Sequence, residues 1–190
     1  HAFNRIESAD AGSPLDGDEI RILATSNDRT YYSETTTALI EWSSKEILIT
    51  GATAAGVVDG TRPTIYGTDL GTGENAIWKV TVSTADQMTI ANLKFDGGDD
   101  ADCHHCITFS SNNNHNIKWV NCQFTQAADH GFDIDGNAQY NSFINCQFDN
   151  NGGDGLYHNG THFGAMYNCI CNDNAARGAY FSSSARVIQT

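Results

Sequence analysis

The chain has 190 residues, which suits one domain with a continuous core and is too short to predict two. It carries 23 Asp and Glu against 10 Lys and Arg, and the resulting formal net charge of -13 argues against a nucleic-acid partner or an anionic membrane surface. No apolar run approaches the ~20 residues that span a bilayer, so we expect no membrane span. Charged residues make up 17%, whereas Gly occurs 18 times and Pro twice, a composition typical of short strands joined by polar turns.

The N-terminal segment differs from the rest of the chain. Phe3, Ile6 and Ala9 have the spacing of an amphipathic helix, and polar residues end this pattern. Such a helix would cover the open end of a coil of strands, where free strand edges invite aggregation. We therefore predict an N-terminal capping segment over residues 1–18 and a body of strands over residues 19–190.

The first half of the body contains short apolar segments with two-residue alternation, which predicts half-buried strands. None of them has a sustained helical period, so the body is predicted to be all-β. The predicted strands cover Glu19–Leu23, Ala38–Trp42, Ile47–Thr50, Gly56–Val58, Thr64–Tyr66, Ile77–Val82 and Met88–Ala91.

The second half contains a repeat. Segments that begin with Asn recur at steps of 29, 24 and 23 residues, and a second series of apolar segments advances with them. Leucine-rich repeats have a similar period, but their Leu-x-x-Leu-x-Leu signature is missing. A coil of about three strands per period, with rungs ~4.8 Å apart, fits better. The first series is Asn92–Phe95, Asn121–Phe124, Asn145–Phe148 and Asn168–Cys171; the second is Ile107–Phe109, Phe132–Ile134, Leu156–His158 and Ala179–Phe181.

Stacking of successive rungs explains the repeated residue types. An Asn at the same turn of each rung can hydrogen-bond to the Asn of the next rung, and this predicts a ladder that satisfies the turn amides. The cysteines of the repeat are predicted to form an inward file and to pack as small apolar groups. The file consists of Cys122, Cys146 and Cys169, with Phe124 and Phe148 beside it.

Several segments together resemble one known group of proteins. The stretch Phe3–Ile22, the segments Ile47–Ala52 and Arg62–Gly67, the Asn-Cys-x-Phe rungs and the turn Gly153–Leu156 resemble the pectate-lyase-like superfamily over nearly the whole chain. The resemblance implies a single-stranded right-handed parallel β-helix, a solenoid with a short N-terminal capping helix. The superfamily includes polysaccharide lyases, glycoside hydrolases, epimerases, phage tailspikes and non-enzymatic surface proteins, so the fold alone implies no single activity. The motif sets of pectate lyases and polygalacturonases are not reproduced, so no catalytic residue is carried over.

One face of the predicted coil combines carboxylates, an amide and tyrosines. Asp133 and Asp135 lie roughly 6.6 Å apart along a strand, close to the ~6.5–9.5 Å carboxyl separation of an inverting glycosidase, and are the candidate catalytic residues. Tyr157, Asn159 and Tyr180 are the candidate glycan-binding residues, because sugars need apolar contact and hydrogen bonds together. The alternative interpretation is a solvated polar sheet face.

A second cluster lies in a predicted loop before this strand series. Neighbouring Asp and His side chains can form a general acid/base pair or a Ca²⁺ site, and Ca²⁺ is the one cofactor that we consider. The alternative is that Asp is common in turns for backbone reasons. A zinc site at the flanking cysteines is disfavoured, because no second pair is evident. The candidate metal ligands are Asp99, Asp100, Asp102, His104 and His105.

These patterns predict an extracellular or virion-surface protein with a structural or glycan-recognition role, whose partner is a polysaccharide or a cell-surface glycan. The alternative is a polysaccharide lyase or glycoside hydrolase that acts on an extracellular polysaccharide. The last segment still reads as a rung, so we expect the coil to continue beyond Thr190 or to pack against another subunit as a homo-oligomer.

Overall fold

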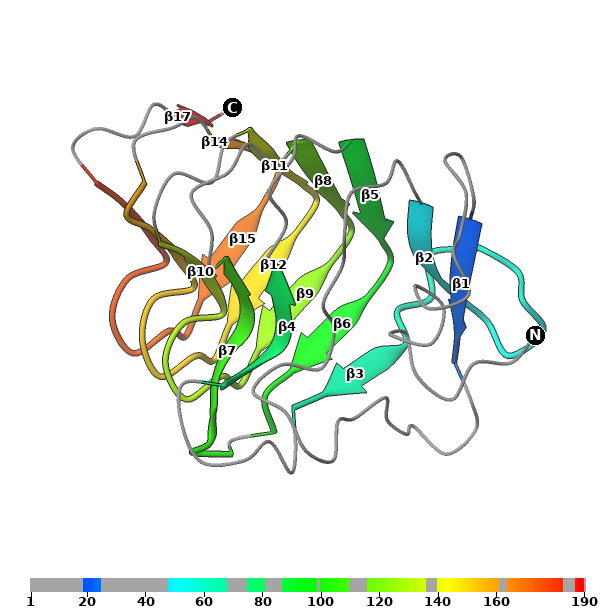
Figure 1. Ribbon diagram of the computed structural model, residues 1–190, viewed down its shortest axis with the longest axis horizontal. Helices are drawn as coiled ribbons and strands as arrows, with labels where there is room; N and C mark the ends of the chain where they lie inside the picture. Colours follow the sequence, from blue (N-terminus) through cyan, green and yellow to red (C-terminus); the bar gives the residue numbers. More distant parts are fainter. Residues whose placement is uncertain are drawn as a thin grey trace.

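The computed structural model describes most of the predicted body. All elements in these residues are β-strands, and every pairing between them is parallel (Figure 1). The predicted cap over 1–18 and the predicted strand Ala38–Trp42 lie outside the described residues. The described residues are 19–24, 48–67, 75–80, 87–98, 100–109, 116–135, 140–160, 164–182 and 187–189.

The strands form three sheets. Sheet A contains, in spatial order, β1 (Glu19–Leu23), β2 (Leu48–Ala52), β5 (Gln87–Ala91), β8 (Asn116–Val120), β11 (Asn141–Ile144), β14 (Gly164–Tyr167) and β17 (Val187–Gln189). Sheet B contains β4 (Asn75–Val80), β7 (Cys103–Phe109), β10 (Phe132–Ile134), β13 (Leu156–His158) and β16 (Ala179–Phe181). Sheet C contains β3 (Thr64–Tyr66), β6 (Lys94–Asp96), β9 (Gln123–Thr125), β12 (Gln147–Asp149) and β15 (Ile170–Asn172).

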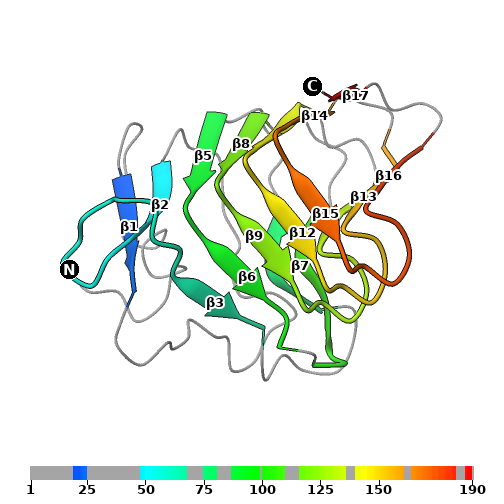
Figure 2. The ribbon, with the colours of Figure 1, turned by 180° about the vertical axis from the view of Figure 1, so that it is seen from behind.

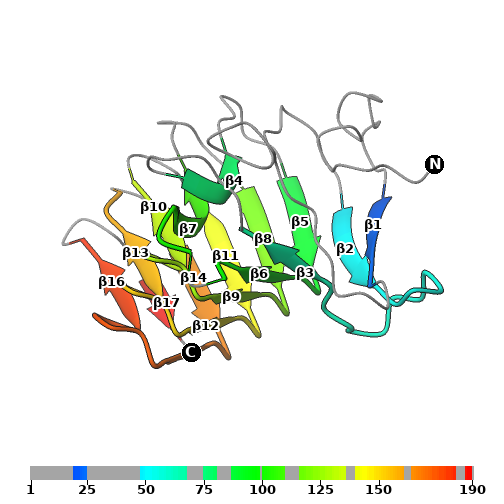
Figure 3. The same cartoon turned by 90° about the horizontal axis from the view of Figure 1, so that it is seen from below.

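The chain passes from sheet A to sheet C, then to sheet B, and returns to sheet A one rung further along. Figures 2 and 3 show the rungs side by side in chain order, from the blue strands at one end to the red strands at the other. This arrangement is a parallel β-helix and confirms the predicted all-β solenoid. Parallel strands in successive rungs place equivalent residues in columns, and these columns build the surfaces described below.

Two sequence-based predictions of local structure are wrong. Residues 56–58 do not form a strand, because Gly56 ends a turn: it has a φ of 78° and its N–H donates to the carbonyl of Thr53. His104 and His105 were expected in a loop, but both lie inside β7.

The asparagine ladder between sheets A and C is present in part, with hydrogen bonds that join two of its pairs. The four ladder asparagines have φ values of 51 to 56°, a left-handed conformation that Asn tolerates better than most residues. The Nδ2 of Asn121 donates to Oδ1 of Asn92 at 2.8 Å, and the Nδ2 of Asn168 donates to Oδ1 of Asn145 at 2.9 Å. The ladder fixes the corner at which each rung enters sheet C.

The core of the coil contains columns of aromatic rings and thiols. Phe124 stacks on Phe95 at 5.5 Å and on Phe148 at 5.0 Å between ring centroids. Cys122 and Cys146 are 0% and 1% exposed, which confirms the inward file, whereas Cys169 in the last rung is only partly buried. Burial raises the pKa of Cys146 far above its usual value, so this thiol stays protonated and packs as an apolar group.

Candidate functional site

A continuous stack of planar side chains runs across the outer side of sheet B. We call it the ring stack; it consists of His105, His130, Tyr157, Tyr180 and Arg177. The centroids of His105 and His130 are 5.5 Å apart, those of His130 and Tyr157 4.5 Å, and those of Tyr157 and Tyr180 5.1 Å, with interplanar angles of 15°, 4° and 17°. The Arg177 Cζ lies 3.9 Å from the Tyr180 ring centroid, over the ring.

A β-bulge brings His105 to this outer face. The register between β4 and β7 shifts between Asn75 and Ala76, which pair with Cys103 and His105. As a result the two-residue alternation of β7 breaks: both histidines are half-buried, and the next two residues, Cys106 and Ile107, are both fully buried. Bulges re-aim side chains in this way and are common beside functional sites.

A second asparagine ladder holds the turns between sheets C and B. The Oδ1 of Asn151 accepts the N–H of Ala127 at 3.1 Å, and the Nδ2 of Asn151 donates to Oδ1 of Asn174 at 2.8 Å. The Nδ2 of Asn174 in turn donates to the carbonyl of Phe148 at 3.0 Å. The sequence analysis missed this ladder, although Asn151 and Asn174 recur at one rung's spacing and each follows a polar residue with a φ near 55°.

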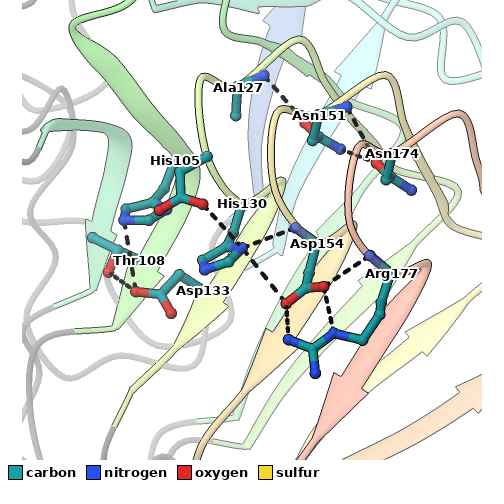
Figure 4. Close-up of polar contacts among 10 residues, drawn as sticks. His105, Thr108, Ala127, His130, Asp133, Asn151, Asp154, Asn174 and Arg177 are labelled. Atoms are coloured by element: carbon teal, nitrogen blue, oxygen red, sulfur yellow. Dashed lines mark hydrogen bonds and ion pairs between the residues drawn. The ribbon is translucent and has the colours of Figure 1, made fainter.

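These turns place three charged or polar side chains at equivalent positions of three successive rungs (Figure 4). Asp154 is 1% exposed, and its carboxylate accepts hydrogen bonds from Nε of Arg177 at 2.8 Å and from Nη2 at 2.9 Å. The N–H of Asp154 donates to Nδ1 of His130 at 3.0 Å. Because Nδ1 accepts, a neutral His130 carries its proton on Nε2.

A histidine and a carboxylate meet at the other end of the stack. The Nε2 of His105 lies 3.9 Å from Oδ2 of Asp133, which also accepts a hydrogen bond from the Thr108 hydroxyl at 3.0 Å. Burial, assisted by the charge of His130, lowers the pKa of His105 to about 4. Burial also lowers the pKa of His130. Both imidazoles are therefore neutral near pH 7, and the Nδ1 of His105 is buried with no hydrogen-bond partner among the described residues.

Residues 75–189 match the family described as right handed beta helix region, which covers more than half of the chain. The chain belongs to the right-handed β-helix family. Comparison with curated proteins and with solved structures gave no match. In the part of the chain that the structure describes, no helix is long and apolar enough to cross a membrane.

The predicted outward column of this β-helix forms in register. Asp133 pairs with Tyr157, which pairs with Tyr180. Asp133 is only 9% exposed, so it is not the solvated carboxylate of the alternative interpretation. Asp135 is exposed, and its Oδ1 accepts a hydrogen bond from Nδ2 of Asn159 at 3.4 Å. A catalytic role for the two carboxylates and glycan binding by Tyr157, Asn159 and Tyr180 stay predictions.

The aromatic faces of the β-helix are not open in the way the sequence implied. His130 stacks on Tyr157, which also stacks on Tyr180, while Arg177 lies over the ring of Tyr180. A sugar ring cannot lie flat on Tyr157 without separating this stack. A sugar can contact the edges of these rings, the phenol hydroxyls and the neighbouring carboxylates instead.

The candidate metal ligands do not converge in the described part of the β-helix. Asp99 lies outside the described residues. Asp100 shapes a turn, in which its Oδ1 accepts the N–H of Asp102 at 3.0 Å. His104 and His105 are neighbours in β7 with ring centroids 6.2 Å apart. No group of three or more His, Cys, Asp or Glu side chains in the described ranges is arranged to hold a metal ion, so the Ca²⁺ site stays a prediction.

Two grooves lie away from the ring stack. One of ≈ 280 Å³ is lined by the beginnings of β5, β8 and β11, including Tyr140. The other, of ≈ 450 Å³, runs along the second ladder beside Asn151 and Gly152. Neither includes a ring-stack residue, so the stack is not part of the wall of either groove.

Proposed function

We propose that this β-helix is an extracellular or virion-surface protein that recognises a polysaccharide along the ring stack. The observation that carries the proposal is the stack itself, which presents one polar ring edge per rung across successive rungs. Rungs are ~4.8 Å apart, close to the advance of one sugar unit in an extended chain. A polysaccharide that lies along the coil axis can therefore repeat the same contact from rung to rung.

The polar groups beside the stack supply the hydrogen bonds that such recognition needs. The phenol hydroxyls of Tyr157 and Tyr180 can donate and accept, and the neutral His130 can donate through Nε2. Asp135 and Asn159 form a second polar column beside them. A row of ring edges that continues from rung to rung suits a long polymer better than a small ligand, which normally occupies a concave pocket.

The test is affinity electrophoresis of the protein through gels that contain neutral, acidic or amino polysaccharides. We expect at least one polymer to retard the protein. We expect Tyr157→Phe to weaken that binding about 2- to 10-fold, the effect of losing one hydrogen bond. Tyr140→Phe is the matched control, because Tyr140 is 51% exposed and lies outside the stack. Equal binding by both variants, or no retardation by any polymer, would contradict the proposal.

A polysaccharide lyase or glycoside hydrolase is the second candidate. The neutral His105 beside Asp133 favours it, since an imidazole with an adjacent carboxylate can exchange a proton with a substrate. The assay follows new reducing ends and the ultraviolet absorbance of unsaturated products from the same polymers. Turnover of a polymer that disappears in Asp133→Asn would show that the protein is an enzyme. If no polymer is turned over, recognition is the function.

We also propose that the last rung is a contact between copies of the chain. β15 and β16 are the terminal strands of their sheets, and Ile170 in β15 is 55% exposed. A second copy that packs on this side chain would remove its apolar surface from water. Light scattering should give more than one chain per particle, and Ile170→Lys should lower that mass. A single-chain mass for the unmodified protein contradicts assembly.

A further inference from the structure

We propose that the polysaccharide recognised at the ring stack carries free amino groups, as a polymer of glucosamine does. This inference rests on the proposed function and adds the chemical class of the polymer. It follows from the distribution of charge around the stack.

Carboxylates flank the stack on both sides. Asp129 lies on the turn side, where its Oδ1 is 3.4 Å from Nδ1 of His130 and its side chain is 48% exposed. Asp133 is the register partner of Tyr157 and is 9% exposed, and Asp135 follows two residues later and is exposed. The pKa of Tyr157 is raised, first by burial and then by Tyr180 and the charges of Asp135 and Asp133, so these carboxylates act on its phenol.

The described cations do not offset these carboxylates. Arg177 uses Nε and Nη2 on Asp154 and lays its guanidinium plane on Tyr180, so its charge is already paired. The two histidines of the stack are neutral near pH 7. Around Tyr157 the described face is therefore negative.

A negative face selects among polysaccharides. A uronic acid or a sulfated sugar would bring like charges together, and this repulsion disfavours its binding. A protonated amine offers three donors, and an ionised carboxylate accepts up to about four hydrogen bonds. Among the described residues Asp135 accepts a single hydrogen bond, at 3.4 Å from Asn159, so its oxygens retain acceptor capacity. Hydrogen bonds between charged partners are also about twice as strong as neutral ones.

The experiment compares two soluble polymers with the same backbone, glycol chitosan with free amines and glycol chitin with acetylated amines, and adds polygalacturonate as the acidic polymer. Binding is measured by isothermal titration calorimetry at about pH 6, which lies above the His105 pKa of about 4. We expect glycol chitosan to bind about tenfold or more tightly than glycol chitin, the effect of one charge-assisted hydrogen bond. Polygalacturonate should not bind.

Charge-matched variants separate a site from general attraction, because a chain with a net charge of -13 attracts any polycation. Asp135→Asn and Asp59→Asn remove the same charge. Asp59 is exposed and lies next to Gly60, whose carbonyl accepts from Asn121 of the ladder between sheets A and C. We expect Asp135→Asn to weaken glycol chitosan binding about tenfold and Asp59→Asn less than about twofold.

The outcomes distinguish the two proposals. Equal effects of the two substitutions, equal affinity for the two chitin derivatives, or tighter binding of polygalacturonate overturns the amino-polymer inference while recognition of a polysaccharide stands. Binding of none of these polymers, nor of the neutral polymers in the gel assay, overturns the proposed function itself.

Discussion

Asp154 and Arg177 form a bidentate ion pair in which the carboxylate is 1% exposed and the guanidinium side chain is 54% exposed. The main-chain N–H of Arg177 also donates to Oδ1 of Asp154, at 2.9 Å. The Asp154 N–H donates to His130 in the preceding turn. Asp154 thus links the turns of three successive rungs, and through Arg177 it contacts the ring of Tyr180.

Asp154→Ala should destabilise the protein and loosen the stack. The main-chain N–H of Arg177 and its guanidinium lose the acceptor that the buried carboxylate provides. This loss costs about 1–3 kcal/mol, and Arg177 is no longer held over Tyr180. Urea unfolding measures the stability change. Asp129→Ala is the control, because Asp129 occupies the neighbouring turn but is half-exposed, and its effect should stay within about 0.5 kcal/mol. Equal losses from the two substitutions would show that Asp154 is not the link.

Gly152→Ala should destabilise the turn that carries this pair. A Cβ at position 152 would lie 2.1 Å from the carbonyl oxygen of Ala128, so backbone must move. We expect a loss of about 1–3 kcal/mol in urea unfolding. At Gly164 in β14 the nearest atom to an added Cβ is 3.7 Å away, so Gly164→Ala should be close to neutral. A neutral Gly152→Ala would mean that the turns are not tightly stacked.

Stability should fall between about pH 6.5 and pH 4, in part through His105. Its pKa is about 4 in the folded protein against about 6.5 in an unfolded chain. The unfolded state therefore binds more protons than the folded state in this window. The contribution of His105 to the free energy of unfolding is complete above the unfolded pKa and is lost as pH falls towards the folded pKa. The shift corresponds to up to about 3 kcal/mol.

The test of this pH dependence is the urea midpoint of the protein and of His105→Gln measured across the same window. The variant should lose stability less steeply with falling pH, because glutamine does not titrate. Parallel curves for the two proteins would contradict a depressed His105 pKa.

The first asparagine ladder yields a prediction about backbone conformation. Asn145 has a φ of 55° and accepts from Asn168. Asn145→Ala should remove the hydrogen bond and place at this position a residue that adopts the left-handed conformation less readily. We expect it to cost about 1–3 kcal/mol of stability. Asn145→Gly loses the hydrogen bond but keeps the conformation, so its loss should be smaller. Greater destabilisation by Gly than by Ala in urea unfolding would rule out this explanation of the ladder.

The sequence predicted features that depend on the rung repeat. Equivalent residues of successive rungs must stack, so the asparagine positions of the ladder and the column of Asp133, Tyr157 and Tyr180 follow from spacing alone. The strand Thr64–Tyr66 follows from its two-residue alternation. The inward register of His158, which is 2% exposed, follows in the same way. The periodicity of the sequence is sufficient to predict these features, because each residue has the same environment as the equivalent residue of the next rung.

The rest of the site depends on departures from the repeat. His105 reaches the outer face because β4 and β7 pair with a bulge, and no local pattern marks a bulge of that kind. His130 contacts Tyr157 although Asp133, not His130, is the register partner of Tyr157. Arg177 finds Asp154 across a turn whose geometry is set by the second ladder. Such contacts become visible only once the turns are placed in three dimensions.

The most direct measurement for the central claim is hydrogen–deuterium exchange with and without the polysaccharide that binds in the gel assay. Recognition along the ring stack predicts new protection in residues 130–135, 156–159 and 177–182, with little change along the groove beside Asn151 or in β5. Protection confined to either groove, or no change in sheet B on binding, would contradict it.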